Sequence, residues 1–286
     1  MMKRLLFLIL VASCCGTLMG QRLQTPTLSP FTEISQHLGL SSITLTYSRP
    51  SAKGRKVFGG LVPYGEVWRT AANASSKITF TEAVQVGGQA VPAGTYAIYS
   101  IPGPSTWTII LHKNLKLRSL AGGGYQASND LCRFEVAVRP NAHKVETFTM
   151  QFADLTYNSC QLLIKWEYVT VAIPIQMPVE AGVEAQIDSL FSDPSKASAR
   201  NYFAAAQFYL EIGSRLEQAI DYIDLALGKD SDNFRYALLK SKILHKQGNK
   251  EEALKVVEEA HEMAKTANNA NYIEQTRLYK EVIKAS

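Results

Sequence analysis

The chain has 286 residues, of which 46% are hydrophobic and 19% are charged. These values exclude an intrinsically disordered chain, and the length is sufficient for two domains. The charge is unevenly divided, because residues 21–176 carry 14 Lys and Arg against 8 Asp and Glu, whereas residues 177–286 carry 14 against 17. Neither part is basic enough to predict a nucleic-acid partner.

The first twenty residues have the pattern of a targeting segment. Lys3 and Arg4 precede an unbroken apolar run, Leu5–Val11, and small residues follow, as in a secretory signal peptide. The apolar run is shorter than the roughly 20 residues that a permanent transmembrane helix needs. Residues 1–20 are therefore predicted to be a signal peptide, and the mature protein is expected to be exported to the periplasm or cell envelope.

Two processing alternatives fit this segment. Cleavage after Gly20 would release a soluble protein that begins at Gln21. The sequence Leu10–Cys14 also resembles a lipobox, after which Cys14 would become a lipid-modified N-terminus, although Val11 stands where such motifs prefer Leu. We expect the protein to associate with a membrane only in the second alternative.

From Ser42 to Ile175, short β-rich runs alternate with turn residues. Gly87 and Gly88 lie between two such runs and predict a tight hairpin, because glycine supplies the positive φ that hairpin turns need. No segment of helical period separates the runs, so residues 21–176 are predicted to form an all-β domain, a sandwich in preference to a barrel. The predicted strands are 43–47, 77–81, 84–86, 89–91, 96–101, 106–112, 131–138, 145–152, 159–168 and 169–175.

After Pro178 the composition changes to Ala, Leu, Glu and Lys at helical spacing. Three positions recur 34 residues later, a period typical of tetratricopeptide (TPR) repeats: they are Ala219, Ile223 and Ala226, followed by Ala253, Val257 and Ala260. The turn glycines Gly213 and Gly248 are offset by one residue, so a plain helical hairpin bundle is the alternative. Residues 177–286 are predicted to be a TPR-like all-α domain, whose groove suits a protein partner.

The stretch from Arg49 to Asn73 is the most unusual part of the β-domain. Loops this long in compact domains are often functional, and guanidinium groups beside aromatic rings can hold a carboxylate, a phosphate or a sugar ring. The structural alternative is that Trp68 closes one end of the domain and backbone carbonyls fix Arg69. The candidate ligand-binding residues are Arg49, Arg55, Tyr64, Trp68, Arg69 and Asn73, and the expected ligand is a small anion or a glycan.

The same stretch resembles a known family. Tyr47–Pro50, Phe58–Gly65 and Val67–Thr70 are similar to the bacterial domain of unknown function 2911 of the Bacteroidetes type, as are Pro92–Tyr96 and Trp166. The resemblance covers residues 29–175. It implies an exported protein with a β-domain, sometimes followed by TPR repeats, and it implies no activity. Ala71 stands where the family pattern has Gly, which is expected to relax the loop slightly.

No catalytic residue, metal site or cofactor is predicted. His37, His112 and His143 lack the spacing of metal ligands and are interpreted as surface residues. Cys132 and Cys160 either form a disulfide, which an oxidising compartment permits, or are small buried strand residues. We expect their strands to flank a common neighbour, which would place the two thiols too far apart to bond.

Three functions are open at this point. The preferred hypothesis is a non-enzymatic envelope adaptor, in which the β-domain binds a ligand or partner and the helices dock a second protein. The alternative is an enzyme that acts on an envelope glycan or peptide through the Arg49–Asn73 loop. In the third hypothesis the helices only brace the β-domain.

Overall fold

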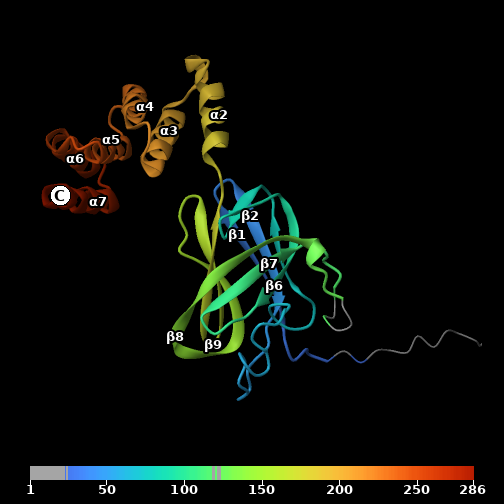
Figure 1. Cartoon of the computed structure of the whole chain (residues 1–286). Coiled ribbons are helices and arrows are strands. Elements are labelled where there is room, and N and C mark those ends of the chain that lie inside the picture. Colours follow the sequence, from blue (N-terminus) through green and yellow to red (C-terminus); the bar gives the residue numbers. More distant parts are fainter. Residues whose placement is uncertain (1–22, 24, 118–119, 121–123) are drawn as a thin grey trace, which may run out of the picture. The chain divides into compact units, whose positions relative to one another are not determined.

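The computed structural model describes residues 23, 25–117, 120 and 124–286 (Figure 1). The predicted signal peptide and Cys14 lie outside these residues. The chain divides into two compact units: the first comprises the chain up to His37, Ser41–Asp154 and Gln161–Ile175, and the second comprises Leu38–Leu40, Leu155–Cys160 and Gln176–Ser286. The predicted fold class, an all-β part followed by an all-α part, is confirmed.

The first unit is an open antiparallel sheet of nine strands in the order β1-β2-β3-β6-β7-β8-β9-β4-β5. Alternation sets the faces, as in β2, where Ile43, Leu45 and Tyr47 are buried between partly exposed polar residues. The strands are β1 (Phe31–Leu38), β2 (Ser41–Ser48), β3 (Ser76–Phe80), β4 (Val84–Val86), β5 (Gln89–Val91), β6 (Gly94–Ile101), β7 (Thr106–His112), β8 (Asp130–Ala153) and β9 (Ser159–Gln176).

Strands β8 and β9 are longer than predicted. The corner expected at Pro140 and Asn141 is a shift of register inside β8, between Pro140 and Val145, so one strand replaces two. The first part of β8 pairs with β7, up to the pair of Ala137 with Thr106, and the part from Val138 onward pairs with β9. Strand β8 therefore belongs to both halves of the sheet.

Strand β1 was not predicted. Its apolar residues Phe31, Ile34 and Leu38 do not alternate with a period of two, which hides a strand from pattern analysis. In the structure the side chains of β1 nevertheless alternate, and Phe31 is exposed while Leu38 is buried.

The sheet folds back on itself around an aromatic core. An isolated antiparallel bridge joins Ser51, after β2, to Thr147 in β8. The Tyr47 hydroxyl donates to the carbonyl oxygen of Met150 at 2.9 Å and accepts its N–H at 3.0 Å. The largest side chains inside, all with less than 2% exposure, include Trp107, Tyr99, Phe80 and Phe148.

The two cysteines of strands β8 and β9, Cys132 and Cys160, are both free. Their predicted placement on strands that flank a common neighbour is wrong, because β8 and β9 are themselves neighbours. Cys132 lies in the first part of β8 opposite Leu111 of β7, whereas Cys160 lies at the start of β9, beside the end of β8. The length of β8 separates them.

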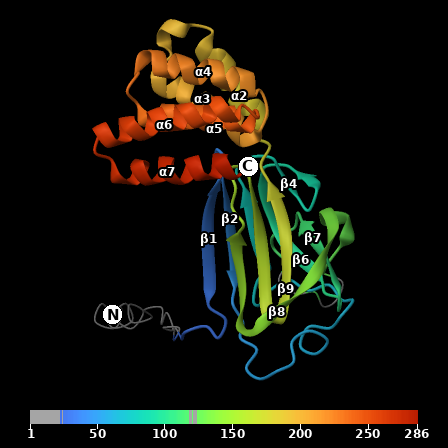
Figure 2. The same cartoon turned by 90° about the vertical axis from the view of Figure 1, so that its left-hand side faces the viewer.

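The second unit contains six α-helices in the described residues (Figure 2). Ala219, Ile223 and Ala226 on α4 and their counterparts Ala253, Val257 and Ala260 on α6 all have 0% exposure. Small residues allow the helices of each hairpin to approach closely. The helices are α2 (Glu180–Phe191), α3 (Ala199–Ile212), α4 (Leu216–Lys229), α5 (Phe234–Lys246), α6 (Lys250–Thr266) and α7 (Ala270–Ala285).

The one-residue offset of the turn glycines lies in the connections. Helices α4 and α6 begin 34 positions apart, at Leu216 and Lys250, but α3 and α5 begin 35 positions apart. Both turns have three residues, 213–215 and 247–249, but Gly213 is the first residue of its turn and Gly248 is the second. The two hairpins thus have turns of equal length, and α3 is one residue longer than α5 at its start.

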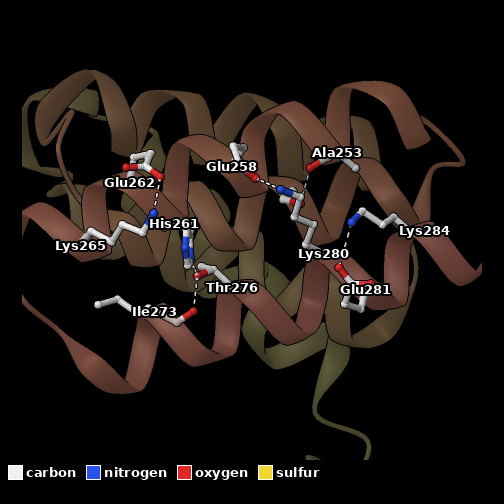
Figure 3. A network of polar contacts seen from close by, with 11 residues as sticks. Ala253, Glu258, His261, Glu262, Lys265, Ile273, Thr276, Lys280, Glu281 and Lys284 are labelled. Atoms are coloured by element: carbon white, nitrogen blue, oxygen red, sulfur yellow. Dashed lines mark hydrogen bonds and ion pairs between the residues drawn. The ribbon is translucent and has the colours of Figure 1, made fainter.

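Polar contacts join α6 to the last helix, α7 (Figure 3). The His261 ring bonds through Nδ1 to the Thr276 hydroxyl at 2.8 Å. Lys280 pairs with Glu258 and lowers the pKa of that carboxyl. None of the helices that the structure describes is long and apolar enough to cross a membrane.

Candidate functional site

The predicted site begins where β2 ends, and Arg49 is held against β8. Its Nε donates to the carbonyl oxygen of Phe148 at 3.2 Å and its Nη2 donates to the Thr149 hydroxyl at 2.8 Å. The side chain is half-buried. Arg49 therefore secures the start of the loop to the opposite part of the sheet.

Arg55 closes the next turn. Its Nε donates to the carbonyl oxygen of Ala52 and its Nη2 to that of Ser51, both at 2.9 Å. Two carboxylates from β8 and β9 fix the same segment from outside: Glu146 accepts the N–H of Lys53 at 2.6 Å, and Glu167 accepts the N–H of Val57 at 2.9 Å.

The tip of the loop is a closed turn. The N–H of Gly59 donates to the carbonyl oxygen of Val62 at 2.9 Å, and the N–H of Val62 donates to that of Val57 at 2.8 Å. A Cβ on Gly59 would lie 2.7 Å from the Tyr64 ring, and φ is +74° there, so only glycine fits. Tyr64 packs on this glycine and remains 43% exposed.

Trp68 belongs to the core. Its ring lies 5.6 Å from Phe148, 6.0 Å from Trp107 and 6.2 Å from Trp166, centroid to centroid. Its main chain exchanges two hydrogen bonds with Ser100 of β6, at 2.7 and 2.8 Å. Trp68 thus closes one end of the aromatic core, as in the structural alternative.

The loop ends in a strained turn. Thr70, Ala71 and Asn73 have φ of 51°, 150° and 61°, values that side-chain-bearing residues rarely adopt. The expectation that Ala71 relaxes the loop is wrong, because a Cβ is strained at this φ. Arg69 Nη1 donates to the carbonyl oxygen of Asn73 at 2.7 Å, and Asn73 Nδ2 donates to that of Ser29 at 3.3 Å.

A second polar cluster lies beside β6 and β7. His112, interpreted above as a surface residue, has 0% exposure, and its ring stacks on Tyr125 at 5.2 Å. Tyr125 donates to Asp130 at 2.7 Å and accepts from Arg133 at 3.0 Å. Burial and the Asp130 carboxylate raise the pKa of Tyr125 to about 12. His112 accepts the N–H of Asn114 through Nδ1. The cluster therefore fixes Asn114, just after β7, through His112, and it fixes Tyr125 through Asp130 and Arg133.

The helical unit carries an open hollow of about 480 Å³ lined from three helices: Leu210 of α3, Lys242, His245 and Lys246 of α5, and Tyr279 of α7. Lys242 Nζ lies 5.5 Å from the centre of the Tyr279 ring. The His245 ring bonds through Nδ1 to the Tyr279 hydroxyl at 2.9 Å. The hollow therefore combines cations with aromatic and aliphatic surface.

The family described as "Protein of unknown function (DUF2911)" matches residues 29–175. The chain belongs to the DUF2911 family. A solved structure from Bordetella parapertussis, the solution structure of protein BPP2914, is 14% identical and has a TM-score of 0.32, over 38% of this chain and 90% of that chain. No curated protein matches the chain.

In this DUF2911 domain the residues that carry the resemblance build the loop itself. Phe58 packs its ring against Trp107 at 4.9 Å, Gly59 admits Tyr64, and Trp68 completes the core. Arg49, Arg55 and Arg69 each donate to backbone carbonyl oxygens. The structure thus shows a structural contact for each of the six candidate residues, and these residues do not converge on one set of contacts. The six are Arg49, Arg55, Tyr64, Trp68, Arg69 and Asn73.

Sequence reasoning missed two features of the DUF2911 chain. The first is the pair of carboxylates, Glu146 and Glu167, that fix the loop, for which the sequence holds no signal beyond their charge within strands. The second is the cationic side of α5, which the spacing of Arg235, Lys242 and Lys246 does indicate, because seven and four residues return a helix to one face. No group of three His, Cys, Asp or Glu in the described residues is placed to hold a metal ion.

Proposed function

We propose that the protein is a non-enzymatic adaptor of the cell envelope, in which TPR-like helices dock a protein partner. The observation that carries this proposal is the hollow on α3, α5 and α7. Alternate helices of a repeat array line its inner surface, where a peptide or helix can bind.

The electrostatics of the hollow favour an acidic partner segment. Lys242 and Lys246 line the hollow, and Arg235 lies on the same side of α5 outside its lining. None of the three forms an ion pair with any described carboxylate. Arg235 instead lies 5.5 Å from the ring centre of Tyr272 on α7. Cations left unpaired beside aromatic rings are available to carboxylates of a partner, although residues 177–286 carry a net negative charge.

The enzyme alternative rests on the Arg49–Asn73 loop. The arginines of that loop donate to main-chain carbonyl oxygens, an arrangement that favours a scaffold over a catalytic centre. A small anionic or glycan ligand at this loop is therefore the weaker proposal for the β-domain.

Site-specific crosslinking tests the adaptor proposal. A photo-crosslinking residue at Leu210 in the full mature chain, exposed to native envelopes, is expected to capture a discrete protein. The charge reversals Lys242→Glu and Lys246→Glu, at two residues that line the hollow, should abolish capture. Reversal of Lys229 and Lys255, which lie outside the hollow, should leave it intact. Capture that survives the first set of reversals would reject the hollow as the docking surface.

A further inference from the structure

The tip of the Arg49–Asn73 loop fixes apolar side chains in contact with water. Leu61 is 47% exposed and Tyr64 is 43% exposed, and Pro63 between them is exposed as well. The turn beneath them is closed by main-chain hydrogen bonds, including one from Leu61 to Lys56 at 3.0 Å. Exposed apolar side chains gathered on a fixed turn indicate a contact surface.

Cations border this apolar tip. Three of them precede it in the loop, are exposed, and form no ion pair with any described residue: Lys53, Arg55 and Lys56. The carboxylate of Glu146 is engaged by the N–H of Lys53 and by Lys144, whose Nζ lies 3.5 Å away. Glu167 accepts the N–H of Val57 in the same segment, and Glu66 is exposed in the adjoining sequence. The surface is therefore apolar at its centre, and at its edge the four cations Lys53, Arg55, Lys56 and Lys144 outnumber these three carboxylates.

The same end of the first unit receives the chain from its N-terminal side. The N–H of Arg49 donates to the carbonyl oxygen of Pro30 at 2.9 Å, and Asn73 donates to that of Ser29. Figures 1 and 2 both show the loop and the residues that lead into β1 at one end of the sheet. Ser29 and Pro30, just before β1, thus lie beside the loop.

We propose that residues 53–64 are a contact site for an anionic lipid surface. Leu61 and Tyr64 enter the boundary between headgroups and acyl chains, and the three cations bind headgroup phosphates. A membrane fits this surface because exposed apolar side chains bordered by cations are the pattern with which proteins bind at an anionic lipid interface. A lipid at Cys14 would add a second attachment to the membrane, and weak membrane contacts become stable in pairs.

Vesicle sedimentation of the mature chain, residues 21–286, tests the proposal. Vesicles of equal parts phosphatidylglycerol and phosphatidylcholine are expected to bind the protein, and pure phosphatidylcholine vesicles much less. The triple variant Lys53→Gln, Arg55→Gln, Lys56→Gln should reduce partitioning roughly a hundredfold, at about fivefold per cation. The matched variant Lys77→Gln, Lys113→Gln, Lys116→Gln removes the same charge elsewhere in the unit and should change partitioning much less.

The apolar part has its own variant and a direct readout. Leu61→Ser with Tyr64→Ser should weaken binding, whereas Leu155→Ser in the β8–β9 turn, where Leu155 is 51% exposed, should not. A solvent-sensitive fluorophore on Leu61→Cys in a Cys132→Ser background is expected to shift to the blue with anionic vesicles, and the same label on Leu155→Cys should stay unchanged. Equal partitioning of all variants, or no shift at position 61, would overturn the proposal.

Discussion

The Glu167 carboxylate accepts a 2.9 Å hydrogen bond from the N–H of Val57, a residue 110 positions earlier in the chain. Val57 is fully buried, so its N–H has no access to water and depends on this acceptor. A side chain of β9 thereby fixes the conformation of the loop that the sequence singled out.

Removing this acceptor should destabilise the β-unit. Glu167→Ala leaves a buried N–H without a partner, which costs about 1–3 kcal/mol, whereas Glu167→Gln retains an acceptor oxygen and should cost less. Urea unfolding followed by tryptophan fluorescence measures the difference. Glu135→Ala, at an exposed position of β8, is the control, and equal stability of the two Ala variants would contradict the role of Glu167.

The strained turn predicts a stabilising substitution. Ala71 has a φ of 150°, and this backbone conformation costs a residue with a Cβ about 1–3 kcal/mol. Glycine removes the strain but loses more conformational entropy on folding, at a cost of about 0.5–1 kcal/mol. Ala71→Gly should therefore raise the free energy of unfolding by about 1 kcal/mol. Ala74→Gly, where φ is not positive, should lower it, so a thermal melt of both variants should show shifts of opposite sign.

The rate at which thiol reagents modify Cys160 is expected to depend on pH. Burial raises the pKa of its thiol from 9.0 to about 11, so at pH 8 roughly one molecule in a thousand carries the reactive thiolate. Modification of the Cys132→Ser mature chain by a disulfide reagent should be slow at pH 8 and quicken about tenfold per pH unit. Rapid modification of the folded protein at pH 8 would contradict this burial.

The sign of the linked stability follows from the same pKa. The folded protein favours the protonated thiol, so Cys160 contributes stability that is fully present below pH 9 and is lost as the pH rises towards about 11. Cys160→Ala should show a smaller loss of stability over that interval. Unfolding midpoints measured across it supply the comparison.

The two helical hairpins are expected to respond alike to substitution. Ala219 and Ala253 occupy equivalent positions with 0% exposure, and replacement of either by Leu should overpack the hairpin by about 1–3 kcal/mol. Ala204→Leu on the exposed side of α3 should have little effect. Urea unfolding followed by circular dichroism would test this, and a tolerant Ala253→Leu would argue against the equivalence of the hairpins.

Much of the fold is predictable because its signals are local. The alternation in Ile43–Tyr47 and the recurrence of Ala219 as Ala253 each report a repeating environment within a few residues or one repeat. Strand β1 was not predicted, because its apolar residues Phe31, Ile34 and Leu38 do not alternate. It is a strand because it pairs with β2, and not because of its own pattern.

The candidate site was less predictable, because its residues act through distant partners. Composition showed that arginines and aromatics gather between Arg49 and Asn73. It could not show that the partners of these arginines would be carbonyl oxygens, such as that of Phe148 for Arg49. Every residue of a chain has a carbonyl oxygen, so the sequence does not show which of them will accept a hydrogen bond from an arginine.

The 24-residue strand β8 has a consequence for the dynamics of the β-unit. Because the same strand supplies hydrogen bonds to β7 and to β9, neither half of the sheet has a complete ladder of its own. The two halves should then open together, and native-state hydrogen exchange should give the amides of Ile109 in β7 and Leu162 in β9 the same protection. The β-unit would behave as a single foldon.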